Sequence, residues 1–241
     1  MSQNLITKTV TQHQQTLFSL NLRTVSDLFP GFAPGDFAVV HGSPSMAYLT
    51  SLLCVRSQLP TELGGLDSNV VFVDCGNTFS ASQVARIAGI NHLEPKQVSE
   101  RIFLFRAFTA YQITTLIMKR LKNAVEKYDA SFVVISDLAG LFLNQGISDE
   151  EAERFFRQVV AYLQNLAQEK QIVVVATCPS RRGNSRSAFL RTVTCEKAGV
   201  VIGLCQTMFD SEFVLEKHPR FMLGDSEFPL ENLTLMDFAA Q

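Results

Sequence analysis

The most informative stretch of the chain is Val39-Val40-His41-Gly42-Ser43-Pro44-Ser45-Met46-Ala47-Tyr48-Leu49-Thr50. It begins inside an apolar run over residues 37–41, which predicts a buried strand. It ends inside a run of helical character, which extends over about residues 47–59. The stretch is therefore predicted to form a tight loop that carries the chain from a strand into a helix.

This place between a strand and a helix is where phosphate-binding loops carry the pattern G-x-x-x-x-G-K-[ST]. Gly42 keeps the first position, but Ala47, Tyr48 and Leu49 replace the second glycine, the lysine and the hydroxyl residue. The lysine would reach the β- and γ-phosphates and the hydroxyl would hold Mg²⁺, which neither Tyr nor Leu can do. We therefore expect that this chain does not hydrolyse ATP by the usual route.

The altered loop still has two serines and the N–H groups of a helix N-terminus, which attract anions. The alternative is that Pro44, Met46 and Tyr48 fill the former nucleotide space, and we favour it. Ala47 lacks the conformational freedom of the second glycine, so the backbone is less able to curl around phosphates. We predict a vestigial nucleotide site without a bound cofactor, ATP with Mg²⁺ being the minor alternative. Its residues would be Gly42, Ser43, Ser45 and Tyr48.

Length and composition limit the classes of protein that remain. With 241 residues the chain is long enough for one large α/β domain. Its net charge of −2 gives no global attraction to nucleic acid or membrane, so any nucleic-acid site must be local. Five scattered cysteines without a C-x-x-C pair predict neither a disulfide framework nor a metal site. The polar N-terminus, and the lack of an apolar run of ~20 residues, predict a cytoplasmic protein without membrane contact, nucleoid-associated or nuclear in a eukaryote.

Short β-branched runs bounded by turn residues alternate with helical patterns along the chain. Strands are predicted over residues 37–41, 69–74, 101–106, 131–136, 170–176, 199–205 and 212–216. Helices are predicted over residues 47–59, 80–87, 111–127 and 149–169. The last of these helices begins with the capping-box pair Ser148 and Glu151. Near-continuous apolar strands indicate burial on both faces, and hence a mainly parallel central sheet flanked by helices.

Five passages follow one another in a fixed order: LNLRTVSDLFPGFAPGD at 20–36, FVDCGNTF at 72–79, FRAFTAYQ at 105–112, VVISDLAGLF at 133–142 and VLEKHPR at 214–220. Together they resemble the core ATPase domain of the RecA/RadA strand-exchange recombinases and their paralogues. The resemblance implies an α/β fold with a RecA-like P-loop ATPase core. It also implies a paralogue with degenerate Walker motifs, RadB-like or related. We expect an N-terminal lead-in over residues 1–17 and a single RecA-like domain over residues 18–241.

The chain departs from the family pattern at positions that carry the chemistry. Catalytically active relatives have a glutamate after the second strand that activates the attacking water, and Gly76 stands at that position. The Walker B carboxylate aligns with Ser136, or with Asp137 if the strand end shifts by one residue. The lysine, the Mg²⁺ hydroxyl and the water-activating acid are thus all replaced. We expect no catalytic residue, and we add Asp137 to the vestigial nucleotide site.

The segment over residues 179–191 contains four arginines and no acid. In the family that it resembles, the loop at this place enters the DNA-binding channel, and guanidinium groups suit phosphates. Its glycine, asparagine and serines predict a mobile loop, and Phe189 could add base stacking. The alternative is a solvated loop whose arginines pair with acids or with a partner protein. The predicted contacts to single-stranded DNA are Arg181, Arg182, Arg186 and Arg191.

Other basic residues are less specific. Arg106 matches a family motif but is expected to form a structural ion pair. Lys119, Arg120 and Lys122 are expected on the solvated face of a helix.

The acidic tail over residues 210–241 is either an edge strand with a closing segment or a docking surface. Phe18 is a candidate for packing into an adjacent subunit, as a Phe-containing linker does in the recombinases.

The function predicted from these features is that of a catalytically degenerate recombinase paralogue. It would act as an accessory factor in homologous recombination or DNA repair and bind single-stranded DNA, a recombinase or paralogue partner, or both. One alternative is an ATPase completed in trans by a partner subunit, with Thr50, Ser51 and Asp137 as the local Mg²⁺ candidates. Another is a regulatory scaffold of the KaiC-like branch that does not bind DNA.

Overall fold

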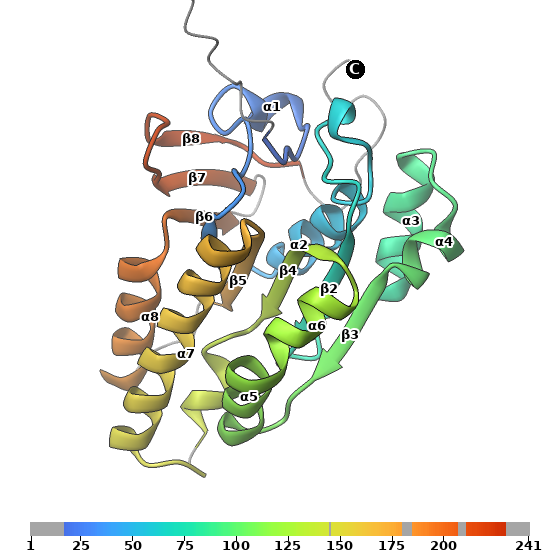
Figure 1. The fold of residues 1–241 in the computed structure, drawn as a ribbon. Coiled ribbons are helices and arrows are strands. Elements are labelled where there is room, and N and C mark those ends of the chain that lie inside the picture. Colours follow the sequence, from blue (N-terminus) through green and yellow to red (C-terminus); the bar gives the residue numbers. More distant parts are fainter. Residues whose placement is uncertain (1–16, 145, 180–184, 207–210, 230–241) are drawn as a thin grey trace, which may run out of the picture.

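The central feature of the computed structural model is an eight-stranded sheet, shown with its helices in Figure 1. The structure describes residues 17–144, 146–179, 185–206 and 211–229. The strands are β1 (Phe37–Gly42), β2 (Asn69–Asp74), β3 (Ile102–Arg106), β4 (Ala130–Ser136), β5 (Val173–Pro179), β6 (Val200–Gln206), β7 (Ser211–Lys217) and β8 (Gly224–Glu227). Their order is β3-β2-β4-β5-β1-β6-β7-β8, in which the pairs from β3 to β6 are parallel and those of β7 and β8 are antiparallel.

Helices cover both faces of this sheet. They are α1 (Arg23–Ser26), α2 (Met46–Arg56), α3 (Ala81–Ile90), α4 (Pro95–Glu100), α5 (Ala110–Leu116), α6 (Lys122–Lys127), α7 (Asp149–Lys170) and α8 (Ser185–Lys197). A π-helical turn (Ile117–Leu121) joins α5 to α6, and short 3-10 helices cover Thr61–Leu63 and Gly140–Leu143. One apolar core lies under α1, α2 and α3, and a second lies under α5 to α8. In Figure 1 the helices from α5 to α8 lie on the near side of the sheet.

The predicted fold class is confirmed: the sheet is mostly parallel and helices flank it on both sides. Most predicted strands agree with the structure within one or two residues at each end. β5 begins later than predicted, because α7 continues to Lys170 and ends at Gln171, whose left-handed backbone (φ 54°) stops the helix. The capping box is present, since Ser148 Oγ accepts the N–H of Glu151 at 3.3 Å.

The helix α8 corrects the sequence prediction. Residues from Ser185 onward form α8, although the segment over residues 179–191 was predicted as a mobile loop. This helix buries Leu190, Val193 and Thr194. Burial of these side chains outweighs the polar, turn-forming composition of its first residues.

Phe18 packs into its own domain, so its predicted insertion into a neighbouring subunit is wrong. The ring is fully buried and meets Phe132 edge-on with 5.1 Å between ring centroids. The backbone N–H of Phe18 donates to the carbonyl oxygen of Phe32, and that bond is reciprocated, both at 2.8 Å. Ser19, the residue after Phe18, is also held in place, because the buried guanidinium of Arg56 donates to its carbonyl oxygen at 3.2 Å.

Candidate nucleotide and nucleic-acid sites

The loop after β1 is packed tightly against β6. Gly42 has a φ of 120°, and a side chain there would overlap the carbonyl oxygen of Leu204. The next residue, Ser43, donates its N–H to the same oxygen at 2.8 Å. Gly42 is therefore needed for the approach of two strands, which is a structural use of the first motif glycine.

The backbone N–H groups of this loop are engaged within the protein. Ser45 N donates to Ser43 Oγ at 3.2 Å, Met46 N to the Ser43 carbonyl at 3.3 Å, and Ala47 N to the Pro44 carbonyl at 3.1 Å. A phosphate-binding loop instead points such groups at the phosphate oxygens. In this conformation the N–H groups of Ser43, Ser45, Met46 and Ala47 are committed to protein acceptors.

Tyr48, at the position of the motif lysine, points into the core. It is 1% exposed and belongs to the apolar core that lies under α2 and α3. The guanidinium of Arg86 on α3 lies 5.8 Å from its ring centroid. Met46 is also buried, whereas Pro44, the third residue predicted to fill the nucleotide space, is exposed. The loop thus places an aromatic ring in the core where the motif places a charged amine near phosphate.

Two carboxylates are buried at the carboxyl ends of β2 and β4. Asp74 accepts a hydrogen bond from the Ser136 hydroxyl at 2.7 Å and another from the N–H of Thr78 at 2.9 Å. Arg106 Nε is 3.9 Å from the other Asp74 oxygen, so the expected structural ion pair is present at the edge of ion-pair range. Ser136, one of the two Walker B candidates, is thereby bonded to Asp74, which holds the turn after β2.

Asp137, the other Walker B candidate, lies against Gly76 and Gly140. It follows β4 in a left-handed conformation (φ 48°), and its N–H donates to Thr177 Oγ1 at 2.9 Å. A Cβ at Gly76 would lie 2.8 Å from the Asp137 Cβ, and a Cβ at Gly140 would overlap the carboxylate. Both glycines therefore make room for this buried side chain, and a glutamate at position 76 would collide with it.

The hydroxyl groups of the remaining Mg²⁺ candidates are hydrogen-bonded within the protein. The Thr50 hydroxyl donates to the Ala47 carbonyl at 3.0 Å, and the Ser51 hydroxyl lies 2.9 Å from both that oxygen and Gln83 Oε1. In the part of the chain that the structure describes, no group of three His, Cys, Asp or Glu side chains is placed to hold a metal ion. As folded, these residues do not fit the phosphates and metal of a Mg²⁺–nucleotide.

Asp74 and Asp137 line one side of a cavity of about 300 Å³, together with Cys75 and Arg106. Burial raises the pKa of the Cys75 thiol, and the charges of Asp137 and Asp74 raise it further. A thiol kept protonated is a poor nucleophile and metal ligand.

The predicted nucleic-acid contacts fall into three groups. Arg181 and Arg182 lie outside the described residues. Arg186 is largely buried, pairs with Asp149 and donates to the carbonyl oxygens of residues 142, 144 and 147 at 3.1–3.2 Å. Its guanidinium thus fastens the start of α8 to the loop after β4, which favours a structural role over a phosphate contact.

Arg191 is exposed and borders a small cavity of about 90 Å³ that also includes His41 and Asp137. His41 Nε2 is 2.8 Å from a carboxylate oxygen of Glu216 on β7. The structure therefore brings Arg191 and Asp137 to the same edge of the sheet. It does not bring Tyr48 to them, since that ring faces the other core.

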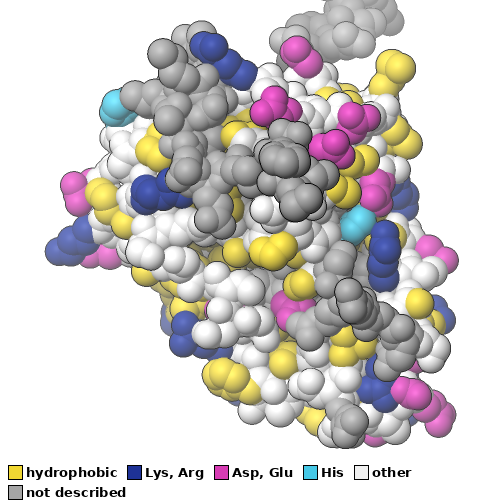
Figure 2. Space-filling model, turned by 180° about the vertical axis from the view of Figure 1, so that it is seen from behind, with side chains coloured by type: hydrophobic (Ala, Val, Ile, Leu, Met, Phe, Trp, Pro, Cys, Tyr) yellow, Lys and Arg dark blue, Asp and Glu magenta, His cyan; other side chains and the backbone are white. Residues whose placement is uncertain are grey.

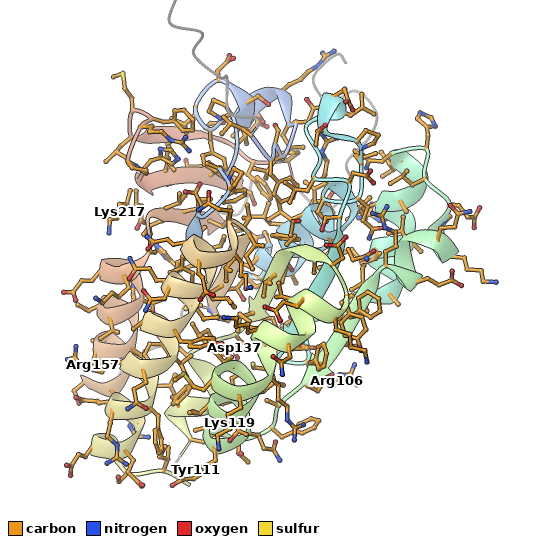
Figure 3. The ribbon with its side chains drawn as sticks, in the orientation of Figure 1. Arg106, Tyr111, Lys119, Asp137, Arg157 and Lys217 are labelled. Carbon is orange, nitrogen blue, oxygen red and sulfur yellow. The ribbon has the colours of Figure 1, made fainter. Side chains whose placement is uncertain are left out.

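A basic and aromatic region near α5 was not identified as a site from the sequence. Figure 3 shows Arg106, Tyr111 and Lys119 around the lower end of α5, far from Lys217. Phe108 precedes this helix, which begins with Thr109 and Gln112 in capping positions. The T-x-x-Q pattern was the available signal, because it marks a helix start and leaves the preceding aromatic residue outside the helix. On the opposite face, drawn in Figure 2, the visible Lys and Arg side chains are dispersed.

The sheet order, the loop after β1 and the carboxylates after β2 and β4 define a RecA-type α/β domain. A sequence model of the Rad51 family matches residues 25–201, which is more than half of the chain, so the chain belongs to this family. The DNA repair and recombination protein RadA of Cenarchaeum symbiosum (strain A) is 23% identical over 193 residues, covering 78% of this chain and 45% of that protein.

RadA of Metallosphaera sedula, described by the same words, is 27% identical over 167 residues, covering 66% of this chain and 47% of that protein. The chain thus spans about half the length of the curated relatives that it matches. Within the described residues, none of the helices has the length and apolarity required to cross a membrane.

Proposed function

We propose that this protein is a catalytically degenerate member of the Rad51 family that acts as an accessory factor in homologous recombination or DNA repair. It binds single-stranded DNA, a recombinase partner, or both, and does so without turning over ATP. The role in repair is supported by its similarity to the DNA repair and recombination protein RadA of two archaea. It would act in the cytoplasm in association with the nucleoid, or in the nucleus if the source is a eukaryote.

The observation that carries the proposal is the state of the loop after β1. Its amides are bonded within the protein, and Tyr48 is buried where the motif requires an exposed lysine. Catalysis of phosphoryl transfer consists largely of positioning and of charge stabilisation around the phosphates. A loop without a cation and without available amides supplies neither.

The surroundings of Asp137 support the same conclusion. The general base of active relatives would need a side chain at position 76, and Asp137 fills that volume. Restoration of ATPase activity would require simultaneous changes at the loop, at position 76 and at Asp137.

DNA binding is supported by the four arginines over residues 179–191, of which Arg191 is exposed. Because Arg186 is engaged within the protein, the direct contacts of this segment reduce to Arg181, Arg182 and Arg191. Three phosphate contacts give modest affinity with a strong dependence on salt concentration.

The test measures phosphate release and ATP binding by the purified chain, alone and mixed with a RadA-type recombinase. We expect no hydrolysis above background by the chain alone and no increase over the recombinase's own rate in the mixture. In parallel, Arg181→Glu/Arg182→Glu should weaken binding to an unstructured oligonucleotide. A rate that rises in proportion to added chain would support the trans-completed ATPase. Unchanged DNA binding by the charge-reversed variant would favour the scaffold without DNA contact.

A further inference from the structure

A cavity of about 450 Å³ lies where β3 passes into α5. Four of its lining side chains, which we call the corner cluster, are Arg106, Phe108, Tyr111 and Arg120. Within the described chain its lining includes two arginines and no carboxylate. The volume is in the range of sites that hold small ligands or parts of larger ones.

The corner cluster carries positive charge that the protein hardly neutralises. Arg120 and the neighbouring Lys119 are exposed, and neither forms an ion pair with the residues that the structure describes. The Arg106 side chain is 48% exposed, and its one ion pair, with Asp74, spans 3.9 Å. In a chain of net charge −2, this local excess of cations fits an anionic ligand.

Phe108 is an exposed aromatic ring on a fixed backbone. It is 70% exposed. Its N–H donates to Gln112 Oε1 at 2.9 Å, and the N–H of Gln112 donates to Thr109 Oγ1 at 3.1 Å. These reciprocal bonds hold the start of α5 and the residue before it. The backbone that carries the ring is therefore held in place, and the ring is exposed to solvent, as a stacking surface requires.

Tyr111 provides a second ring one turn further along. It is 47% exposed, its hydroxyl donates to Glu151 at 3.3 Å, and its ring meets that of Phe155 edge-on at 5.8 Å. Phe108 also lines two adjoining cavities of about 300 and 190 Å³. All three cavities border Phe108, and the one of about 300 Å³ also includes Asp74 and Asp137.

We propose that the corner cluster binds single-stranded nucleic acid, with Phe108 and Tyr111 stacking against unpaired bases and Arg106 and Arg120 bonding to phosphates. Exposed rings alternating with guanidinium groups are the pattern that binds unpaired strands without sequence preference. A duplex keeps its base faces stacked inside and would use only the arginines. The inference rests on the proposed DNA binding, but it assigns the contact to a surface other than the arginine segment over residues 179–191.

The chain has no tryptophan, which allows a direct test. Phe108→Trp places a single fluorescent ring in the corner cluster. Met222→Trp places one at another exposed position, between β7 and β8, as a control. Titration with oligothymidylate should quench the Phe108→Trp emission in a saturable way that weakens with salt, and should leave the Met222→Trp emission unchanged. Unchanged Phe108→Trp emission, while anisotropy shows that the oligonucleotide is bound, would overturn the inference.

Affinity measurements complete the test. Loss of one base-stacking ring in Phe108→Ala should weaken oligonucleotide binding by roughly tenfold. Arg120→Ala should make the plot of log affinity against log salt concentration less steep, by roughly the amount that one phosphate contact contributes. Because both side chains are exposed, circular dichroism should report an unchanged fold for both variants.

The outcomes separate this inference from the proposed function. If Arg181→Ala/Arg182→Ala weakens binding and the corner variants do not, the chain binds DNA but the corner cluster does not. If the wild-type chain binds no oligonucleotide, the inference fails, and the proposed function is reduced to an accessory factor that binds a recombinase partner. If the corner variants keep their DNA affinity but lose binding to a recombinase or to a second copy of the chain, the corner cluster is a protein interface and the inference is overturned.

Discussion

Replacement of Phe18 by alanine should lower the free energy of unfolding by about 4 kcal/mol. The ring is fully buried and contacts Phe132 edge-on at 5.1 Å and Phe32 at 6.0 Å between centroids. Of the expected loss, roughly 1 kcal/mol is the aromatic pairing, and the rest is the burial of the ring and the cavity that its removal leaves. The backbone bonds to Phe32 would remain, since they do not involve the side chain.

The assay is urea unfolding followed by circular dichroism, at two protein concentrations. Phe108→Ala is the matched control, because it removes the same ring from an exposed position and should change stability by less than about 0.5 kcal/mol. A loss of about 4 kcal/mol approaches the whole stability of a marginal domain. Phe18→Leu is therefore measured as well, with an expected loss of about 1 kcal/mol from the aromatic pairs.

Two results would refute the reasoning. One is a loss below about 1 kcal/mol for Phe18→Ala, which would mean that the ring is not part of the core. The other is a loss that depends on protein concentration, which would mean that Phe18 packs into another subunit. The expected result is a loss that is the same at both concentrations.

Three further predictions concern other parts of the molecule. Arg186→Gln should lower the free energy of unfolding by about 2 kcal/mol, measured in urea, and leave the salt slope of DNA binding unchanged, because its guanidinium bonds Asp149 and backbone carbonyls. Gly140→Ala should lower the melting temperature, because its Cβ would overlap the Asp137 carboxylate, and Asp137→Ala in the same chain should restore part of the loss. Burial, with the charge of Arg220, lowers the pKa of His218 from 6.5 to about 4. As pH falls, the His218 side chain is protonated in the unfolded chain before it is protonated in the folded protein, so the free energy of unfolding should decline between pH 6.5 and pH 4. The decline should be smaller in His218→Asn, which lacks this titrating group. Equal declines in the two proteins would contradict this reasoning.

The strands could be predicted because their apolar, β-branched runs have few alternatives in a soluble protein. β2 agrees at both ends, since turn residues bound the run on either side. β8 could not be predicted in this way. Its sequence, GDSE, has little strand propensity, and the strand exists because β7 offers an antiparallel partner at the edge of the sheet.

The loop after β1 was predictable in part. The motif comparison indicated that Tyr48 could not replace a lysine, and the structure adds that the ring is buried. The position of Asp137 was not predictable, because it depends on the space left by Gly76 and Gly140, which are far apart in sequence. A sequence motif indicates which residue is missing from a site, but it does not indicate which other side chain fills the space that the missing residue leaves.

The arginine segment shows the limit of reading charge from sequence. Four arginines without acids suggested phosphate contacts, yet Arg186 finds its acceptors in Asp149 and in backbone carbonyls some forty residues away along the chain. A guanidinium bonds carbonyl oxygens as readily as phosphate oxygens, and only the fold decides which it meets. Arg120, together with Lys119 and Lys122, was predicted to lie on a solvated helix face, and the sequence did not indicate that it borders a cavity with Arg106.

The most direct test of the central claim is an anisotropy titration of labelled single-stranded DNA with the wild-type chain, with and without ATP–Mg²⁺, at low and moderate salt. The account predicts binding that weakens with salt and has the same affinity with and without nucleotide. Binding that requires ATP–Mg²⁺ would contradict it, because the loop after β1 would then hold a nucleotide despite its bonded amides and its buried Tyr48.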